Sequence, residues 1–269
     1  MSAFDPLAPS YDADFTHQPL GKILRERVHE RLLTHFSVGD NVLEIGCGTG
    51  EDALFLAQQG IAITATDASD AMLAIAEEKT KNQKNVTVEP LDLANLPDWK
   101  AQTFDGVFSN FGALNCIDNW QPLAQWLSQH TKTGAKVGLG IMAKYLSGHV
   151  KLGGKVCFGI MSPYCAWEFI WHAGHWKWDI ALRRLRGDDF GDLRITYPTV
   201  KRITQDFAPD FKRVTVKPLG LFLPTSALFD VVQKRPKLMN TLISLEKRFE
   251  NTPQLAQFAD HYWIEFERV

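Results

Sequence analysis

The chain has 269 residues, 45% of them hydrophobic, and a formal net charge of −2. This length supports one sizeable core, and the near-neutral charge gives no basic field for nucleic acid. No apolar run approaches the roughly 20 residues of a membrane span, and the N-terminus lacks the basic and apolar regions of a signal peptide. We expect a cytoplasmic protein with no membrane span and no nucleic-acid partner.

The cysteines also argue against a metal centre. Cys47, Cys116, Cys157 and Cys165 form no CxxC pair and show no metal-ligand spacing. Cysteines of this kind are typical of reduced thiols in a cytoplasmic protein, so we predict that no metal is bound.

The N-terminal part predicts a loop followed by a helix. Residues 4–18 are loop-like, with the aromatic residues Phe4, Tyr11 and Phe15. From Pro19 to Phe36 the apolar residues recur at helical spacing, and proline suits the first turn of a helix.

Residues 41–57 organise the chain. Val42 to Ile45 is short and apolar enough to be a buried strand. A glycine turn, Gly46-Cys-Gly-Thr-Gly50, follows, and then a helix with apolar residues facing inward. Glycine lets the backbone approach a ligand closely, and a helix start offers free N–H groups. This stretch predicts a site for a dinucleotide or for an adenosyl compound.

The spacing of the glycines separates these two ligands. A dinucleotide fingerprint has a glycine at its sixth position, which here is Glu51. Glu51 and Asp52 would oppose a pyrophosphate at the helix N-terminus. The run from Glu44 to Gly50 instead resembles motif I of the class I S-adenosylmethionine-dependent methyltransferases. That cofactor carries a sulfonium and an ammonium group, which carboxylates attract.

Further strands alternate with helices, as in a three-layer α/β fold. A second strand, Ile61 to Thr66, leads to Asp67, which lies 21 residues after Gly46. An acid at this place can accept both hydrogen bonds of a ribose diol, although it could also be an ordinary cap. Ser69 is a plausible N-cap of the next helix. Residues 86–90 and 104–108 read as the third and fourth strands.

The resemblance implies a Rossmann-like, doubly wound, seven-stranded mixed sheet with helices on both faces and inserted helical, aromatic lid segments. It also implies that Tyr11 touches the methionine end of the cofactor and that Asp92 meets the adenine amino group, unless Asp92 is simply a turn residue. The fourth strand and its loop, FDGVFSNFGALN, resemble a small-molecule branch of the superfamily. The expected cofactor-binding residues are Tyr11, Glu44, Gly46, Cys47, Gly48, Gly50, Asp67, Ala68, Met72, Asp92, Leu93, Asn110, Phe111 and Gly112.

A local repeat leaves the fifth strand open. Residues 132–145 are echoed by residues 151–164 at a constant offset of 19 residues. Both copies read as a helix end, a glycine turn and a buried strand, and two units are too few for a solenoid. Counting from the fourth-strand motif favours the first copy as the fifth strand, whereas continuity into Trp167-Glu168 favours the second, which we prefer.

The segment 164–197 is rich in aromatic residues. It could form an aromatic-lined acceptor pocket, an amphipathic surface helix at lipid headgroups, or a cap that packs its own tryptophans. A methyltransferase needs a general base only if the acceptor carries a proton. His172, His175 and Glu168 are weak candidates for that role.

The C-terminal part resembles the antiparallel hairpin of the sixth and seventh strands of the family. Residues 211–216 and 261–268 supply the strands, and the last one alternates as an edge-accessible strand would. We expect a single domain over 1–269. Its parts are an N-terminal lid and helix (1–36), a cofactor-binding half (37–142) and two inserted substrate or lid segments (143–198 and 222–258).

The favoured function is S-adenosylmethionine-dependent methyl transfer to O, N or C of a small-molecule acceptor that is aromatic or lipid-like. One alternative is a non-catalytic S-adenosylmethionine-binding module that engages a partner or membrane through its aromatic lid. A Rossmann-fold oxidoreductase is disfavoured by the missing third glycine. The sequence gives no oligomeric state.

Overall fold

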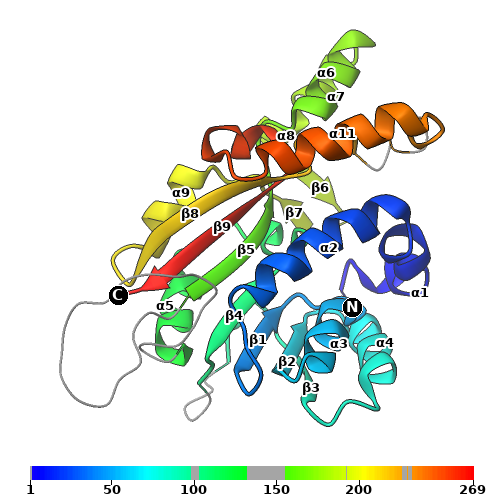
Figure 1. Cartoon of the computed structure of the whole chain (residues 1–269). Coiled ribbons are helices and arrows are strands. Elements are labelled where there is room, and N and C mark those ends of the chain that lie inside the picture. Colours follow the sequence, from blue (N-terminus) through cyan, green and yellow to red (C-terminus); the bar gives the residue numbers. More distant parts are fainter. Residues whose placement is uncertain (1, 98–102, 132–154, 192, 226–228, 230–231) are drawn as a thin grey trace.

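The computed structural model describes the whole chain except residues 1, 98–102, 132–154, 192, 226–228 and 230–231. Its centre is a seven-stranded sheet of order β3-β2-β1-β4-β5-β9-β8 (Figure 1). Strands β1 to β5 pair in parallel, whereas β9 runs antiparallel to both of its neighbours. The strands are β1 (Asn41–Ile45), β2 (Ala62–Asp67), β3 (Val86–Pro90), β4 (Gly106–Ser109), β5 (Lys155–Met161), β8 (Phe211–Leu219) and β9 (His261–Arg268).

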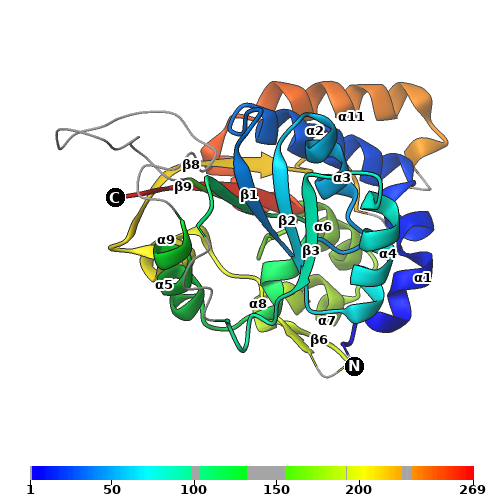
Figure 2. The same cartoon turned by 90° about the horizontal axis from the view of Figure 1, so that it is seen from below.

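Helices cover both faces of this sheet, so the predicted three-layer α/β fold is confirmed (Figure 2). On one face, Phe108 and Trp263 of the sheet share a core with Val28, Leu56 and Met239. On the other face, Val107 and Phe158 pack with helical residues such as Leu127 and Phe207. The first face carries α2 (Pro19–Leu33), α3 (Glu51–Gln58), α4 (Asp70–Thr80) and α11 (Pro236–Phe249), and the second carries α5 (Gln121–His130) and α9 (Val200–Phe207).

The second copy of the repeat forms the fifth strand. Strand β5 belongs to residues 151–164, and it pairs with β4 on one side and β9 on the other. The preference for this copy is therefore confirmed. The first copy, residues 132–145, lies outside the described residues.

The last strand was expected to be accessible at an edge, and that prediction is wrong. Strand β9 lies between β5 and β8, and its side chains from His261 to Phe266 are buried. Its polar Glu265 lies in the core, where Trp263 donates an indole N–H to its carboxylate at 2.6 Å. The edge strand is instead β8, which contains Pro218, a residue that an edge tolerates.

The segments at both ends of the sheet differ from the prediction in detail. The loop expected at 4–18 forms short helical turns, η1 (Asp5–Leu7), α1 (Ala8–Tyr11) and η2 (Asp12–Thr16). The aromatic segment forms α6 (Ala166–Gly174), α7 (Trp178–Ala181) and α8 (Arg183–Arg186), followed by a hairpin of β6 (Asp188–Phe190) and β7 (Leu193–Ile195). No helix among the described residues is long and apolar enough to cross a bilayer.

Candidate cofactor site

The glycine turn lies at the carboxyl end of β1, where a parallel sheet of this class binds its ligands. Gly46, Gly48 and Gly50 have φ values of +72°, +53° and +77°, which only glycine adopts without strain. A Cβ at Gly46 would lie 2.1 Å from the Cβ of Ala113. Glycine therefore lets the short helix η3 (Ala113–Cys116) pack against the turn.

Asp67 joins the glycine turn to the end of β2. Its Oδ2 accepts a hydrogen bond from the Gly48 N–H at 2.9 Å, and its Oδ1 accepts one from the Ser69 N–H at 2.9 Å. Burial raises the pKa of Asp67, although these N–H groups oppose the shift. Ser69 also caps α4, because its Oγ accepts from the Met72 N–H at 3.2 Å. The carboxylate predicted to hold a ribose thus lies beside the glycine turn.

Two buried polar side chains next to the turn have an atom without a protein partner. Glu44 of β1 is 2% exposed, and its Oε2 accepts no hydrogen bond; the Oδ1 of Asn110, after β4, is equally without a partner. Burial raises the pKa of Glu44 well above its usual range, Asp52 raises it further, and Arg25 opposes both effects. Buried polar atoms are normally satisfied, so these two atoms are places where a ligand can bind.

The first turn of α3 is neutralised by the chain itself. Asp52 lies 2.6 Å from Arg25 and 2.7 Å from His29, and Glu51 lies 3.0 Å from Lys79. Burial alone would raise the pKa of Asp52, but Arg25 and His29 outweigh it and hold that pKa well below its usual range. The interpretation that these two carboxylates attract a cationic cofactor is therefore not supported, because their charges are already paired.

Phe111 has a strained backbone at the predicted methyl path. Its φ is +52°, which is rare for a non-glycine residue and is often found at functional sites. The Arg25 guanidinium lies 4.8 Å from the centre of its ring, and Phe15 meets the ring edge-on at 5.1 Å between centroids. Gly112 follows with φ +90°, where a Cβ would lie 2.9 Å from Met161 Sδ.

The N-terminal turns lie over this site. Tyr11 is the nearest neighbour of a Cβ placed on Gly48, at 4.0 Å, and burial raises the pKa of its phenol. Asp12 accepts hydrogen bonds from Thr49 Oγ1 at 2.6 Å and from Lys79 Nζ at 2.8 Å. Ser69 Oγ donates to Asp5 at 2.6 Å. Three side-chain hydrogen bonds from Asp5 and Asp12 thus attach this segment to the glycine turn, to Ser69 and to α4.

The remaining expected cofactor residues are spread around the turn. Cys47 is buried and donates its N–H to Thr66 O at 2.8 Å, and Met72 is buried in α4. Ala68 is exposed. Asp92 is also exposed and accepts from the Ala94 N–H and from Asn95 Nδ2, which are turn contacts. Leu93 packs partly against the core.

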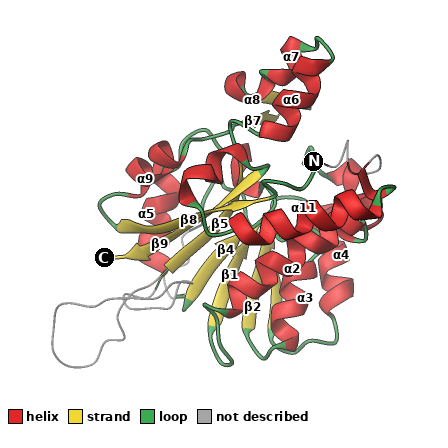
Figure 3. Cartoon of the chain, turned by 45° about the horizontal axis from the view of Figure 1, so that its top comes forward, coloured by secondary structure: helices red, strands yellow, loops and turns green. Residues whose placement is uncertain are grey.

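The three weak candidates for a general base lie on α6 or directly after it. Glu168 is buried and lies 2.5 Å from Arg183 and 2.8 Å from Arg184. Both of its carboxylate oxygens are engaged by arginines of α8, so the structure assigns Glu168 to anchoring that helix. His175 is exposed and contacts the Trp171 carbonyl at 2.7 Å, and His172 is half-buried. Helix α6 stands away from α3 and α4, which flank the glycine turn (Figure 3).

The structure brings a histidine to the site that the sequence analysis missed. His261 begins β9 opposite Met161, and its ring lies 6.2 Å from that of Phe111. Its Nδ1 lies 3.1 Å from Asp260 Oδ2, close enough for an ion pair but not aligned as a hydrogen bond. Burial would raise the pKa of Asp260, but His261 and Arg184 outweigh it and keep that pKa low. The sequence did offer one signal for this site, because Asp260 and His261 are adjacent at the start of the predicted last strand.

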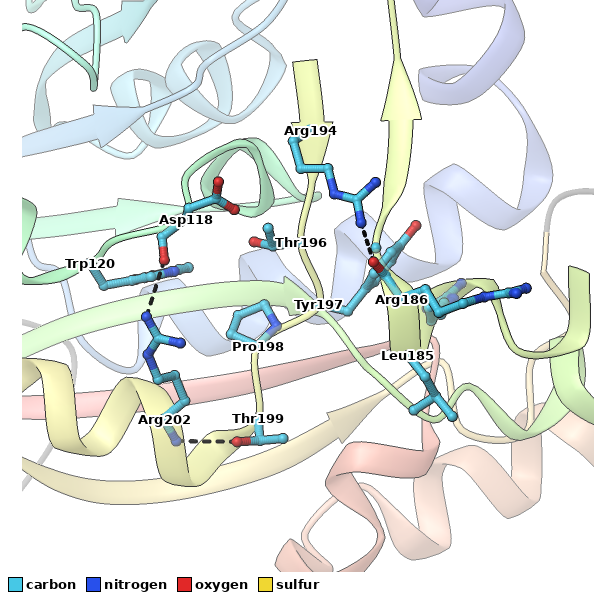
Figure 4. A pocket seen from close by; sticks show the side chains of 12 residues that line it. Asp118, Trp120, Leu185, Arg186, Arg194, Thr196, Tyr197, Pro198, Thr199 and Arg202 are labelled. Atoms are coloured by element: carbon cyan, nitrogen blue, oxygen red, sulfur yellow. Dashed lines mark hydrogen bonds between the residues drawn. The ribbon is translucent and has the colours of Figure 1, made fainter. Parts of the chain in front are cut away.

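A cavity of about 450 Å³ lies beyond η3 (Figure 4). Ala113 of η3 faces Gly46, and the carbonyl of Asn115 accepts a hydrogen bond at 2.7 Å from the N–H of Thr196, which lines the cavity. The cavity walls contain four arginines and one acid, together with aromatic and hydroxyl side chains. These walls are formed by Asp118, Trp120, Arg184, Leu185, Arg186, Gly187, Arg194, Thr196, Tyr197, Pro198, Thr199 and Arg202.

One group of potential metal ligands lies elsewhere among the described residues. The ligand atoms of His35, Cys157 and Glu265 are within 4.8 Å of one another, although sequence spacing indicated no such group. The buried Arg31 interacts with the same Glu265 carboxylate. Glu265 Oε1 already accepts the Trp263 indole N–H at 2.6 Å and lies 3.5 Å from His35 Nε2, so we assign no metal here.

Comparisons with known proteins agree with this geometry. A family model described as a methyltransferase domain matches residues 42–134. A ubiquinone/menaquinone biosynthesis C-methyltransferase of Geobacter sulfurreducens is 32% identical over 132 residues, which cover 46% of this chain and 50% of that protein. A demethylmenaquinone methyltransferase of Thermobifida fusca is 34% identical over 140 residues, covering 50% and 57%. The chain thus spans about half the length of the curated relatives it matches.

Solved structures share the fold at low identity. An S-adenosylmethionine-dependent methyltransferase of Mesorhizobium loti superposes with a TM-score of 0.55 at 17% identity, covering 89% of this chain and 96% of that one. A Haemonchus contortus phosphoethanolamine N-methyltransferase in complex with S-adenosyl-L-methionine gives 0.56 at 17% identity, covering 98% and 57%. Residues 42–134 thus match a methyltransferase domain, and the chain shares the fold of these S-adenosylmethionine-dependent methyltransferases.

Proposed function

We propose that this protein transfers a methyl group from S-adenosylmethionine to a small-molecule acceptor. The observation that carries the proposal is the junction of the glycine turn with Asp67, through the Gly48 N–H at 2.9 Å. The adjacent backbone leaves room for a close ligand, and the acid at the end of β2 suits a ribose diol. The order of the sheet supports a methyltransferase over a dinucleotide oxidoreductase, because β9 runs antiparallel between β5 and β8.

The residues at the turn fit the proposed cofactor. Asp67 offers a carboxylate for the ribose hydroxyls, and the unpartnered oxygens of Glu44 and Asn110 can accept from an ammonium group. When bound, S-adenosylmethionine supplies an electrophilic methyl group on a sulfonium. The share of the chain is to orient the reactants and exclude water, which can lower a barrier by on the order of 7–11 kcal/mol. Tyr11, Phe15 and Phe111 supply the apolar cover for that role.

For the acceptor we propose a flat, apolar molecule, and a quinone ring is the first to test. The relatives named above as acting on quinone precursors support this choice, as do the aromatic rings of Phe15 and Phe111 at the predicted methyl path. We place His261 at the acceptor side as a candidate general base, since it adjoins Phe111 and is paired with Asp260.

The test is a transfer assay with S-adenosylmethionine labelled in its methyl group, counting label in the organic extract. The acceptor is the reduced, quinol form of demethylmenaquinone, because an electrophilic methyl group needs an electron-rich ring carbon. Loss of general-base catalysis lowers rates by on the order of 10²–10⁴-fold, so His261→Asn should reduce transfer by that order. His17→Asn changes an exposed histidine and should retain the wild-type rate. Cofactor binding without transfer to any acceptor in a panel would contradict catalysis and indicate a binding module.

A further inference from the structure

Exposed apolar side chains are concentrated in one segment. Sixteen large hydrophobic side chains are exposed in the described part of the chain, and ten of them lie between residues 164 and 190. Trp176 is 82% exposed and Ile170 is 69% exposed. A soluble protein rarely presents so much apolar surface in one place unless something covers it. The ten are Tyr164, Phe169, Ile170, Trp171, Trp176, Trp178, Ile180, Leu182, Leu185 and Phe190.

Six of these ten side chains lie on a projecting helical hairpin, which we call the α6–α7 hairpin (residues 166–181). Figures 1 and 3 show that it extends beyond the sheet and its covering helices. Helix α6 buries only Glu168, and α7 buries no residue. Trp171, Trp176 and Trp178 are therefore exposed, whereas Trp167 packs against the core. The cavity described above is lined by residues outside the hairpin.

Buried ion pairs fix the base of the hairpin. Glu168 binds Arg183 and Arg184, and Arg184 also reaches Asp260 at 2.7 Å and the Ser162 carbonyl at 3.1 Å. The hairpin is thus anchored to the start of β9 by charged contacts, while its apolar residues face outward. An element held in this way can present its aromatic side chains without support from their own packing.

Positive charge accompanies the apolar surface. Lys177 is exposed at the turn of the hairpin, and at its base the Arg186 side chain is 59% exposed and lies 3.6 Å from the exposed Asp179 carboxylate. The arginine-rich cavity begins at the same place, where Arg186, Arg194 and Arg202 lie around one rim (Figure 4). Arg194 and Arg202 are paired with Asp189 and Asp206, both at 2.9 Å, and guanidinium groups are good ligands of phosphate.

We propose that the α6–α7 hairpin docks the protein on the surface of an anionic lipid bilayer. Tryptophan combines an apolar ring with a polar N–H and favours the interface between headgroups and acyl chains. Basic residues beside it are attracted to anionic lipids, so Lys177 and the arginines at the base face lipid phosphates. A second copy of the chain would cover the apolar residues but would gain nothing from this positive charge. The proposal goes beyond methyl transfer and does not depend on the acceptor.

The test is co-sedimentation of the full chain with vesicles of phosphatidylcholine, with and without phosphatidylglycerol. We expect binding to the anionic vesicles, a blue shift of tryptophan emission and release by salt. The double variant Ile170→Ser with Trp176→Ser should bind at least about tenfold more weakly, since it removes the two most exposed apolar side chains of the hairpin. Val38→Ser changes an equally exposed side chain, 80%, outside the hairpin and should bind like wild type.

Two results would overturn the proposal. One is an absence of sedimentation with anionic vesicles, above all if light scattering shows a dimer that the double variant loses, because a second copy would then be the occupant. The other is equal binding of wild type and double variant, which would place the lipid contact elsewhere. Cofactor titration of the same samples tests the proposed methyl transfer separately from vesicle binding. It also reports whether the double variant is folded.

Discussion

At the scale of single residues, a buried charge cluster supports the cofactor site. Asp52 is 3% exposed and bonds to Arg25, His29 and the amide of Asn110. These contacts connect α2, the first turn of α3 and the loop after β4. Arg25 in turn lies over the ring of Phe111. The cluster therefore fixes the backbone on which Asn110 and Phe111 are presented.

We expect Asp52→Asn to destabilise the protein strongly at neutral pH. Removing one partner of a buried ion pair costs about 3–5 kcal/mol, because Arg25 and His29 are left without a counter-charge. The measurement is the free energy of unfolding in urea at pH 7 and at about pH 3. These pH values lie above and below the unfolded pKa of Asp, about 3.9. Asp179→Asn is the control, since the Asp179 side chain is 99% exposed.

The sign of the pH dependence follows from the depressed pKa of Asp52 in the folded state. Such an acid stabilises the fold fully above its unfolded pKa, and that contribution is lost as pH falls towards the folded value. The difference between wild type and Asp52→Asn should therefore shrink on acidification. A difference that stays constant from pH 7 to pH 3 would show that the Asp52 charge is not what stabilises the cluster.

The sequence indicated where the cofactor site lies better than it indicated how its charges are paired. The glycine turn and Asp67 could be placed because the register of a strand–helix–strand unit fixes both. The partners of Asp52 could not, because Arg25 and Asn110 approach it from elements that the chain brings together only on folding. His261 was missed for the same reason, since it lies far in sequence from Phe111.

At the scale of elements, the N-terminal turns lie over the cofactor site. The segment from η1 to η2 lies over the glycine turn and is bonded to it through Asp12, Thr49 and Lys79. We propose that this segment, together with α2, forms the lid predicted for residues 1–36. Entry of a cofactor would then require these bonds to open, because Tyr11 lies against Gly48.

We expect Asp12→Asn to loosen this segment, because it replaces the carboxylate that bonds Lys79 and Thr49. Hydrogen exchange of amides in residues 5–16 should become faster, and S-adenosylhomocysteine should slow it again by favouring the closed segment. Asp14→Asn changes an exposed acid of the same segment and serves as the control. Exchange that is as slow in Asp12→Asn as in wild type would show that these contacts do not hold the lid in place.

The strands show where a pattern is sufficient evidence and where it misleads. Residues 86–90 form β3 as predicted, because alternation and flanking turns agree there. The alternation in β9 indicated an exposed face, but Glu265 and His261 are buried among partners that only the fold supplies. The choice between the repeat copies likewise depended on what each copy pairs with in space.

At the scale of the whole molecule, the two proposed functions belong to different elements. The cofactor site lies at the carboxyl ends of β1, β2 and β4, where parallel sheets bind ligands. The α6–α7 hairpin follows the carboxyl end of β5, at the same edge of the sheet, but projects beyond the body of the molecule (Figure 1). When the protein docks through the hairpin, its glycine turn lies outside the docking contact, on the body of the molecule. We propose that residues 222–258 and the part of 143–198 after β5 form the inserted acceptor-side segments.

The central claim is that the glycine turn and Asp67 bind an S-adenosyl cofactor. Isothermal titration of the full chain with S-adenosylhomocysteine tests it most directly, with Asp67→Ala and the exposed-site control Asp179→Ala alongside. We predict saturable binding to wild type and to the control, and a loss of about 1–3 kcal/mol in Asp67→Ala, the scale for leaving polar partners unmet. Circular dichroism establishes that each variant is folded. A folded wild type that gives no saturable heat, or an Asp67→Ala variant that binds as tightly as wild type, would contradict the account.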